Sequence, residues 1–191
     1  WGVLDDNLVA AHCVHLTQND MSLMADAGSA AILNPCSNLK LGSGIPKIAQ
    51  MMDSGMLLGV GTDGASSNNN LDMHEDMKLA SLLAKAGGQA DALPACEVLN
   101  MASAHVAMAY GIPAGVIGEG FLADALLLDL KNERLNPLHN LESNWVYAAD
   151  SSAIHSVLCN GKFVMKNRHV DGEEDIVKEA NACALKIAGR K

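Results

Sequence analysis

Three short apolar runs that alternate with helical patterns constrain the fold of this chain more than any other feature. The runs cover residues 8–11, 30–33 and 57–62. Each run is bounded by turn-forming or polar residues, which is the pattern of a buried strand. The segments between them carry apolar residues at helical spacing, and this alternation predicts a parallel sheet with right-handed crossovers. Three such units form part of an α/β barrel or of an open α/β sheet.

The helices around these strands have recognisable ends. We expect them over residues 17–27, 46–54, 72–85 and, without interruption, 94–110. Thr17 is a suitable N-cap for the first helix. Glu75 and Asp76 lie in the first turn of the third helix, where the macrodipole is a sufficient reason for carboxylates. Residues 34–44 are rich in turn formers and are expected to form a loop.

The pattern changes after residue 112. Strands are expected over residues 123–130, 154–159 and 162–165. The last two flank Asn160-Gly161, which is a strong hairpin signal. Residues 173–188 have the pattern of an amphipathic helix, whereas residues 131–150 give no clear assignment. The sequence pattern after residue 112 therefore predicts a small β unit attached to the α/β unit.

One carboxylate, Asp63, stands at the end of the third apolar run and is followed by small and polar residues up to Leu71. Ligands bind at this end of the strands in α/β barrels and open α/β sheets. We therefore predict that Asp63 is a catalytic acid/base or a metal ligand; the alternative is a turn or helix cap. His12 ends the first run in the same way. A histidine there can orient or deprotonate a water that a divalent metal activates.

Two other motifs are excluded by their context. Residues 59–64 match GxGxxG, but the glycines lie within the strand, no helix is expected at Gly64, and the ribose-binding acid is absent. Pro35-Cys36 begins the PCxxC pattern of cytidine-type deaminases, but Leu39 replaces the second cysteine and no HxE is present. Neither nucleotide binding by this loop nor a cytidine-type zinc site is predicted.

Charge and cysteine content narrow the classes of partner. The chain has 13 Lys and Arg against 22 Asp and Glu, a net charge of -9, which argues against a nucleic-acid partner and favours a small neutral or cationic ligand. The five cysteines form no CxxC pair, so reduced thiols and a cytoplasmic location are expected. No apolar run approaches the length of a membrane span, and no membrane contact is expected.

At this point several blocks become recognisable in order: AAHCVHLT, NPCSNLKLGSGIP, GVGTDGASSNNNLDM, IGEGFLADALLLDL and VLCNGKFVMKNRHV. Together they resemble the amidohydrolase superfamily, in the branch of the S-adenosylhomocysteine/5′-methylthioadenosine deaminases and chlorohydrolases. The resemblance covers nearly the whole chain. It implies the C-terminal part of a TIM-type (β/α)8 barrel, strands six to eight, in residues 1–112. Part of a β-sandwich domain would follow in 113–170, and a C-terminal helix in 171–191.

The resemblance also implies roles for individual residues. Asp63 would bind one divalent metal, zinc or else iron, and accept a proton from its water. His12 would assist the proton transfer and is a second candidate metal ligand. The implied substrate-binding positions are Ser67, His15, Asn34, Ser37 and Asn38. The implied reaction is deamination of an adenosine-type substrate by metal-activated water, which releases ammonia.

Two motifs of the family are missing from residues 1–112, the part that resembles the barrel: the HxH pair, and the HxxE motif, from which His12-Cys13-Val14-His15 departs. The sequence also opens on Trp1 and enters a strand pattern within a few residues. We therefore expect that the chain needs a missing N-terminal half of the barrel, that it is inactive alone, and that it forms homo-oligomers. The alternatives within the class are a chlorohydrolase or a guanine/cytosine-type deaminase; the alternative of another class is a truncated, non-catalytic structural module.

Overall fold

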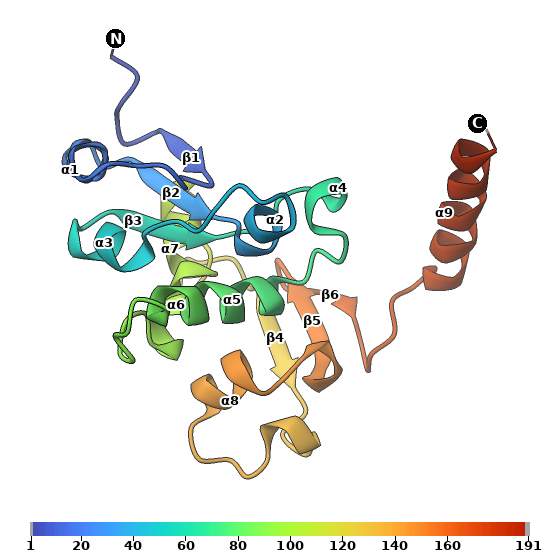
Figure 1. Cartoon of the computed structure of the whole chain (residues 1–191). Helices are drawn as coiled ribbons and strands as arrows, with labels where there is room; N and C mark the ends of the chain where they lie inside the picture. The colour runs from blue at the N-terminus through green and yellow to red at the C-terminus, as the bar shows by residue number, and fades with distance from the viewer. Residues whose placement is uncertain (1, 190–191) are drawn as a thin grey trace.

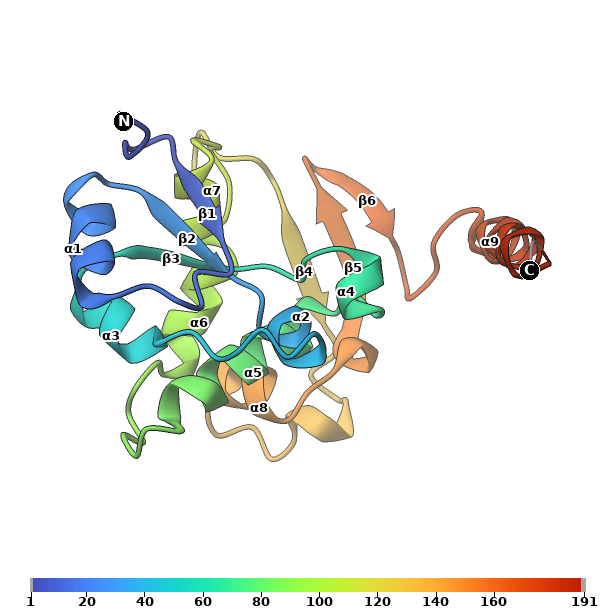
Figure 2. The same cartoon turned by 45° about the horizontal axis from the view of Figure 1, so that its top comes forward.

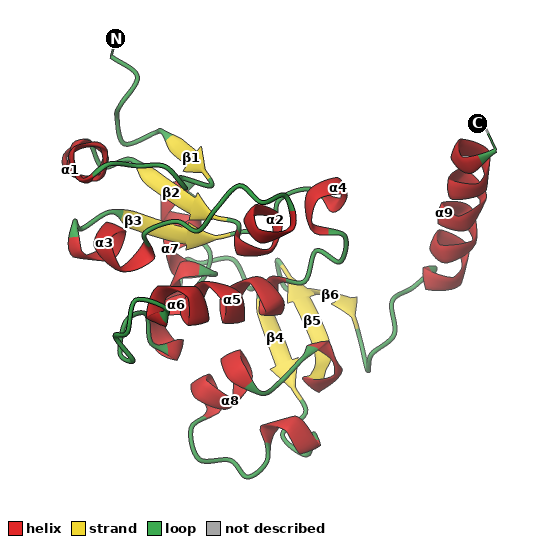
Figure 3. Cartoon of the chain, viewed as in Figure 1, coloured by secondary structure: helices red, strands yellow, loops and turns green. Residues whose placement is uncertain are grey.

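The computed structural model describes residues 2–189 of the chain. Figures 1 and 3 show its helices and strands. The first part contains β1 (Val9–Ala11), α1 (Gln18–Asp26), β2 (Ala30–Leu33), α2 (Pro35–Lys40), α3 (Ile48–Asp53), β3 (Leu57–Val60), α4 (Ala65–Asn68), α5 (Met73–Lys85), α6 (Ala95–Met101) and α7 (Ala104–Ala109). The second part contains β4 (Ala125–Leu128), η1 (Glu133–Leu135), α8 (Leu141–Tyr147), η2 (Ser151–Ala153), β5 (Ile154–Cys159), β6 (Lys162–Met165) and α9 (Glu173–Ala188).

The first sheet is parallel and has the order β1-β2-β3, as the alternation of strands and helices predicts. Its core is built from buried aliphatic side chains of the strands and methionines of the surrounding helices, including Leu33, Val60, Met21 and Met51. Helices α5, α6 and α7 contact β3. Gly59 allows α7 to come close, because a Cβ there would lie 2.6 Å from Ile32 and 2.7 Å from Val106.

Several local predictions are confirmed. Thr17 caps α1 through a capping box with Asp20, which satisfies two backbone N–H groups at the start of the helix. The helix expected over residues 72–85 is α5, and the structure adds that Asp72 caps it by accepting from the backbone N–H of His74. The hairpin between β5 and β6 turns at Asn160 and Gly161, both of which have positive φ, as this dipeptide predicts.

Three local predictions are wrong. The expected loop at 34–44 contains helix α2, because Pro35 and the polar residues after it form a first helical turn rather than a coil. The expected helix over 94–110 is two helices, since Ser103 leaves helical geometry and Gly115 packs against its carbonyl group. A short helix, α4, does begin after Gly64, although no helix was expected there.

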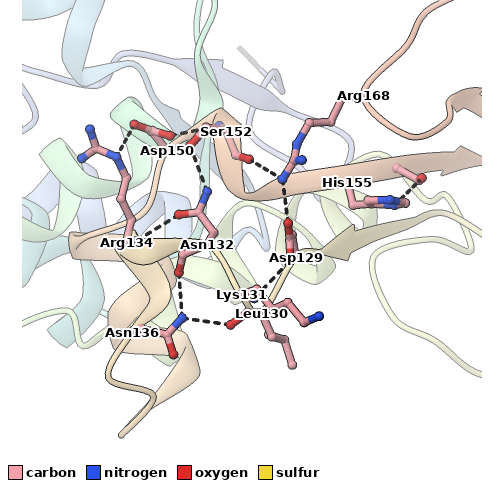
Figure 4. Close-up of polar contacts among 11 residues, drawn as sticks. Asp129, Leu130, Lys131, Asn132, Arg134, Asn136, Asp150, Ser152, His155 and Arg168 are labelled. Atoms are coloured by element: carbon pink, nitrogen blue, oxygen red, sulfur yellow. Dashed lines mark hydrogen bonds and ion pairs between the residues drawn. The ribbon is translucent and has the colours of Figure 1, made fainter.

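The second sheet is antiparallel, with the order β4-β5-β6. The region without a sequence pattern folds beneath it through polar side chains (Figure 4). Asn132 donates to Ser152 at 3.2 Å, and Arg134 pairs with Asp150 at 2.8 Å. Arg168 joins the end of the hairpin to Asp129 at 3.0 Å. Contacts between residues distant in sequence therefore specify the structure of this region, and such structure cannot be predicted from a periodic pattern along the chain.

Helix α9 stands apart from the other elements in both views (Figures 1 and 2). It spans the expected residues, but none of its residues is buried. Trp1 and the last two residues of the expected 171–191 segment lie outside the described residues. Among the helices that the structure describes, none is both long enough and apolar enough to cross a membrane.

Candidate functional site

The candidate site lies at the carboxyl edge of the first sheet, where β1, β2 and β3 end. His12 follows β1, Asn34 follows β2, and Asp63 comes shortly after β3. The backbone N–H of His12 continues the sheet by donating to Ile32 O at 2.9 Å, and it also approaches the side-chain oxygen of Asn34 at 3.3 Å. Parallel pairing thus brings together three polar residues that are far apart in the sequence.

Asp63 is held by two serines from two short helices. Ser37 of α2 donates to Oδ2 of Asp63 at 2.6 Å, and Ser67 of α4 donates to the same oxygen at 2.8 Å. These two hydrogen bonds, together with one from the backbone N–H of Gly64, lower the pKa of the Asp63 carboxyl to about 2. Asp63 is therefore an anion at neutral pH, and its backbone lies in the left-handed region with φ 60°.

His12 faces this carboxylate. Its Nδ1 lies 2.9 Å from Oδ1 of Asn38, an oxygen that can only accept, so Nδ1 carries the hydrogen. Nε2 lies 3.9 Å from Oδ2 of Asp63, and in the tautomer with hydrogen on Nδ1 it carries the lone pair of the ring. This nitrogen can accept a proton or bind a metal.

The structure links six of the seven predicted site residues and leaves one apart. Asn34, Ser37 and Asn38 are buried and reach His12 or Asp63 through the hydrogen bonds described above. Ser67 is partly exposed and completes the group. His15 is exposed on the loop after His12, beside Gly44, and the described residues include no hydrogen bond or ion pair from it to the group.

Sequence reasoning did not predict the role of Asp76, which is fully buried behind the site. Its Oδ1 accepts from the backbone N–H of Cys36 at 2.9 Å, and its Oδ2 accepts from Nδ2 of Asn68 at 2.8 Å. The favourable interaction with the helix macrodipole explains the exposed Glu75 better than it explains the buried Asp76. A usable signal was present, because Asp76 lies four residues before Ala80 and hence on the buried face of α5.

The possible metal ligands at this site, His12 and Asp63, make up only part of a metal site. In residues 2–189, no three His, Cys, Asp or Glu side chains gather closely enough to hold a metal ion. A catalytic zinc typically takes three protein ligands, so His12 and Asp63 do not complete one. These two side chains fit a metal only as partial ligands.

Comparison with known proteins identifies the family to which this chain is similar. The amidohydrolase family profile matches residues 1–164. The chain is 42% identical over 194 residues to the 5-methylthioadenosine/S-adenosylhomocysteine deaminase of Pelotomaculum thermopropionicum, covering 100% of this chain and 45% of that protein. It is 40% identical over 195 residues to the 5′-deoxyadenosine deaminase of Methanothermobacter thermautotrophicus, covering 98% and 45%.

Solved structures agree with these relatives. An adenosine deaminase from Xanthomonas campestris with bound zinc superposes with a TM-score of 0.91 at 34% identity, over 98% of this chain and 43% of that one. The atrazine chlorohydrolase of Arthrobacter aurescens with zinc superposes with a TM-score of 0.87 at 28% identity, over 95% and 41%. The chain thus spans less than half the length of these relatives. It has the fold of part of an amidohydrolase barrel, and the chain belongs to the amidohydrolase family.

Proposed function

We propose that this chain supplies the Asp63 side of the active site of a hydrolytic deaminase that acts on adenosine-type nucleosides. The observation that carries the proposal is the Asp63 carboxylate, to which two serines donate hydrogen bonds and which faces Nε2 of His12 at 3.9 Å. The names of the relatives, which are a 5-methylthioadenosine/S-adenosylhomocysteine deaminase and a 5′-deoxyadenosine deaminase, support the substrate class.

The two side chains divide the work. A zinc or iron ion bound beside them would lower the pKa of a water to about 7. Asp63 would hold the negative charge that favours loss of a proton from such a water, and Nε2 of His12 lies 3.9 Å from Oδ2, so that a water molecule placed beside both side chains could pass a proton between them. The hydrogen bond from Nδ1 of His12 to Asn38 keeps the ring in the orientation that this transfer needs.

Burial separates the remaining site residues into two groups. Asn34, Ser37 and Asn38 are buried, and their hydrogen bonds to His12 and Asp63 suit them to hold these side chains in place. Ser67 and His15 are accessible, and we assign to them the contacts with substrate. Ser67 would thereby connect substrate binding to the charge of Asp63.

The proposal includes a polypeptide that completes the ligand set. Support comes from the two-donor site and from an apolar groove of about 710 Å³ between α7 and strands β4 and β5. Tyr110, Val116 and Ile117 line this groove, and Ile117 is 92% exposed. Such apolar surface is typical of a face that another segment covers.

Co-expression tests the proposal. The chain is produced alone and together with the amino-terminal part of the Pelotomaculum deaminase, and ammonia release from 5′-methylthioadenosine is measured with zinc present. We expect ammonia from the pair and none from the chain alone. Chloride release from atrazine without ammonia would favour a chlorohydrolase instead, as the structural similarity to the atrazine enzyme allows. A folded pair that binds no zinc and releases neither product would refute an enzymatic role.

A further inference from the structure

Two serines donate to the carboxylate of Asp63, and each serine, like Asp63 itself, has a neighbour in the chain that is connected by hydrogen bonds to one buried group. Ser37 and Ser67 donate to Asp63, and Cys36 and Asn68 are the residues next to these serines. The backbone N–H of Cys36 and the side-chain amide of Asn68 both donate to Asp76.

The third neighbour is Thr62, which precedes Asp63. Its carbonyl oxygen accepts from Nδ2 of Asn68 at 2.7 Å, and this same nitrogen donates to Asp76. Asp76 is thus connected to the residue beside Ser37, to the residue beside Ser67 and, through Asn68, to the residue beside Asp63. The segments that it joins come from the ends of two neighbouring strands, β2 and β3.

We propose that Asp76 is a positioning residue that fixes Asp63 and its two serine donors relative to one another. Its two carboxylate oxygens tie α2 and α4 to α5, so that Ser37 and Ser67 converge on Oδ2 of Asp63. The positioning rests on the geometry alone; its consequence for catalysis rests on the proposed function.

The site requires a carboxylate at position 76 for a simple reason. Both groups that face Asp76 are N–H donors, so the side chain must accept on both of its terminal atoms. An asparagine accepts on one atom only, and its amide hydrogens would oppose one of the donors. Burial raises the pKa of Asp76, which marks this position as a costly one for a carboxylate. Such a group persists where the hydrogen bonds that it accepts offset that cost.

The pKa of Asp63 in the folded chain is the appropriate readout. It depends on the two serine hydrogen bonds, whereas a general loss of stability leaves it unchanged in the folded molecules. The purified chain is labelled with ¹³C at the aspartate carboxyls, and the Asp63 signal is followed from neutral pH down to about pH 3, as far as the amide spectrum remains native.

We expect the Asp63 signal of the unaltered chain to stay nearly constant over this range, since its pKa is about 2. Asp76→Asn should raise this pKa by about one pH unit, because the serines lose their convergence. Asn68→Ala removes one of the two ties and should raise it by a smaller amount, and it remains informative if Asp76→Asn does not fold. Asp53→Asn, a change of an exposed aspartate at the end of α3, is the matched control and should leave the Asp63 signal unchanged.

An unchanged Asp63 pKa in folded Asp76→Asn or Asn68→Ala would overturn the proposal. The measurement requires no metal, substrate or second polypeptide. A deaminase that fails to form therefore does not affect the result, and a positioning role that fails does not exclude the deaminase.

Discussion

The two sheets of this molecule differ in how completely they are covered. Every residue of β2 and β3 is buried or half-buried, and helices pack around them. In the second sheet, by contrast, Leu126 of β4 and Phe163 of β6 are each 50% exposed. The candidate site stands on the covered sheet. The side chains of the candidate site are therefore held on a packed sheet, whereas the second sheet exposes apolar side chains to solvent.

The largest effect should come from the site on the covered sheet. In the completed enzyme, Asp63→Ala should abolish both zinc binding and ammonia release, because it removes the anion to which both serines point. Zinc per chain and ammonia release are measured on the same sample, with Asp53→Ala as the control. Activity that persists in Asp63→Ala would exclude this residue from the site.

His12→Ala should lower the rate by about 10²–10⁴-fold, the usual contribution of a positioned acid/base, and should affect zinc content less. The reason is that Nε2 of His12 faces the Asp63 carboxylate, which suits it to proton transfer. His12 and Asp63 alone do not make a complete set of zinc ligands among the described residues. Steady-state kinetics and metal analysis are compared with those of His169→Ala, an exposed histidine beyond β6. Equal loss of zinc and rate would instead make His12 a direct ligand.

Core truncations test the contrast in coverage directly. Leu33→Ala, in a fully buried position of β2, should cost about 2–5 kcal/mol of unfolding free energy, whereas Leu126→Ala should cost less than about half of that. Urea unfolding followed by circular dichroism gives both values. If the two changes cost the same, the second sheet is better covered in solution than in this structure.

Acid should weaken the covered sheet through Asp63. The pKa of this carboxyl in the folded chain, about 2, lies below its ordinary value of 3.8, so Asp63 adds stability above about pH 4 that is lost as the pH falls towards 2. Asp63→Asn should flatten that part of the pH dependence. Unfolding free energies from pH 6 to pH 3 are compared for the two chains, and parallel curves would contradict the assigned pKa.

The smallest effect is expected in the polar network beneath the second sheet (Figure 4). Arg168→Ala removes a partly exposed ion pair with Asp129 and should cost about 1 kcal/mol or less. Lys131→Ala, at an exposed position with no ion pair among the described residues, is the comparison. A cost well above this from Arg168→Ala in urea unfolding would mean that the hairpin end is held more firmly than its exposure indicates.

Local patterns in the sequence predicted the strands of both sheets, whereas residues 131–150 gave no assignment because contacts between residues distant in sequence specify them. Apolar runs with turn residues at each end identified all three strands of the first sheet, and Asp63 and His12 stood out as polar residues at the strand ends. Helix α2 was missed because Pro35 can open either a helix or a loop. Asp76 was missed because a carboxylate in a first helical turn has a sufficient local explanation. The division of the chain at residues 112 and 170 remains a prediction.

Gly59 connects the packing of the first sheet to its chemistry. This residue lies in the strand that leads to Asp63, and the space beside it is filled by Ile32 and Val106. In a saturation library, selection for folded protein alone should deplete substitutions of Gly59 strongly and those of Asp63 only weakly, whereas selection for turnover should deplete every residue except aspartate at position 63. Residues 59–63, which run from β3 into the loop after it, would then show two separate constraints within five consecutive codons, one from folding and one from catalysis.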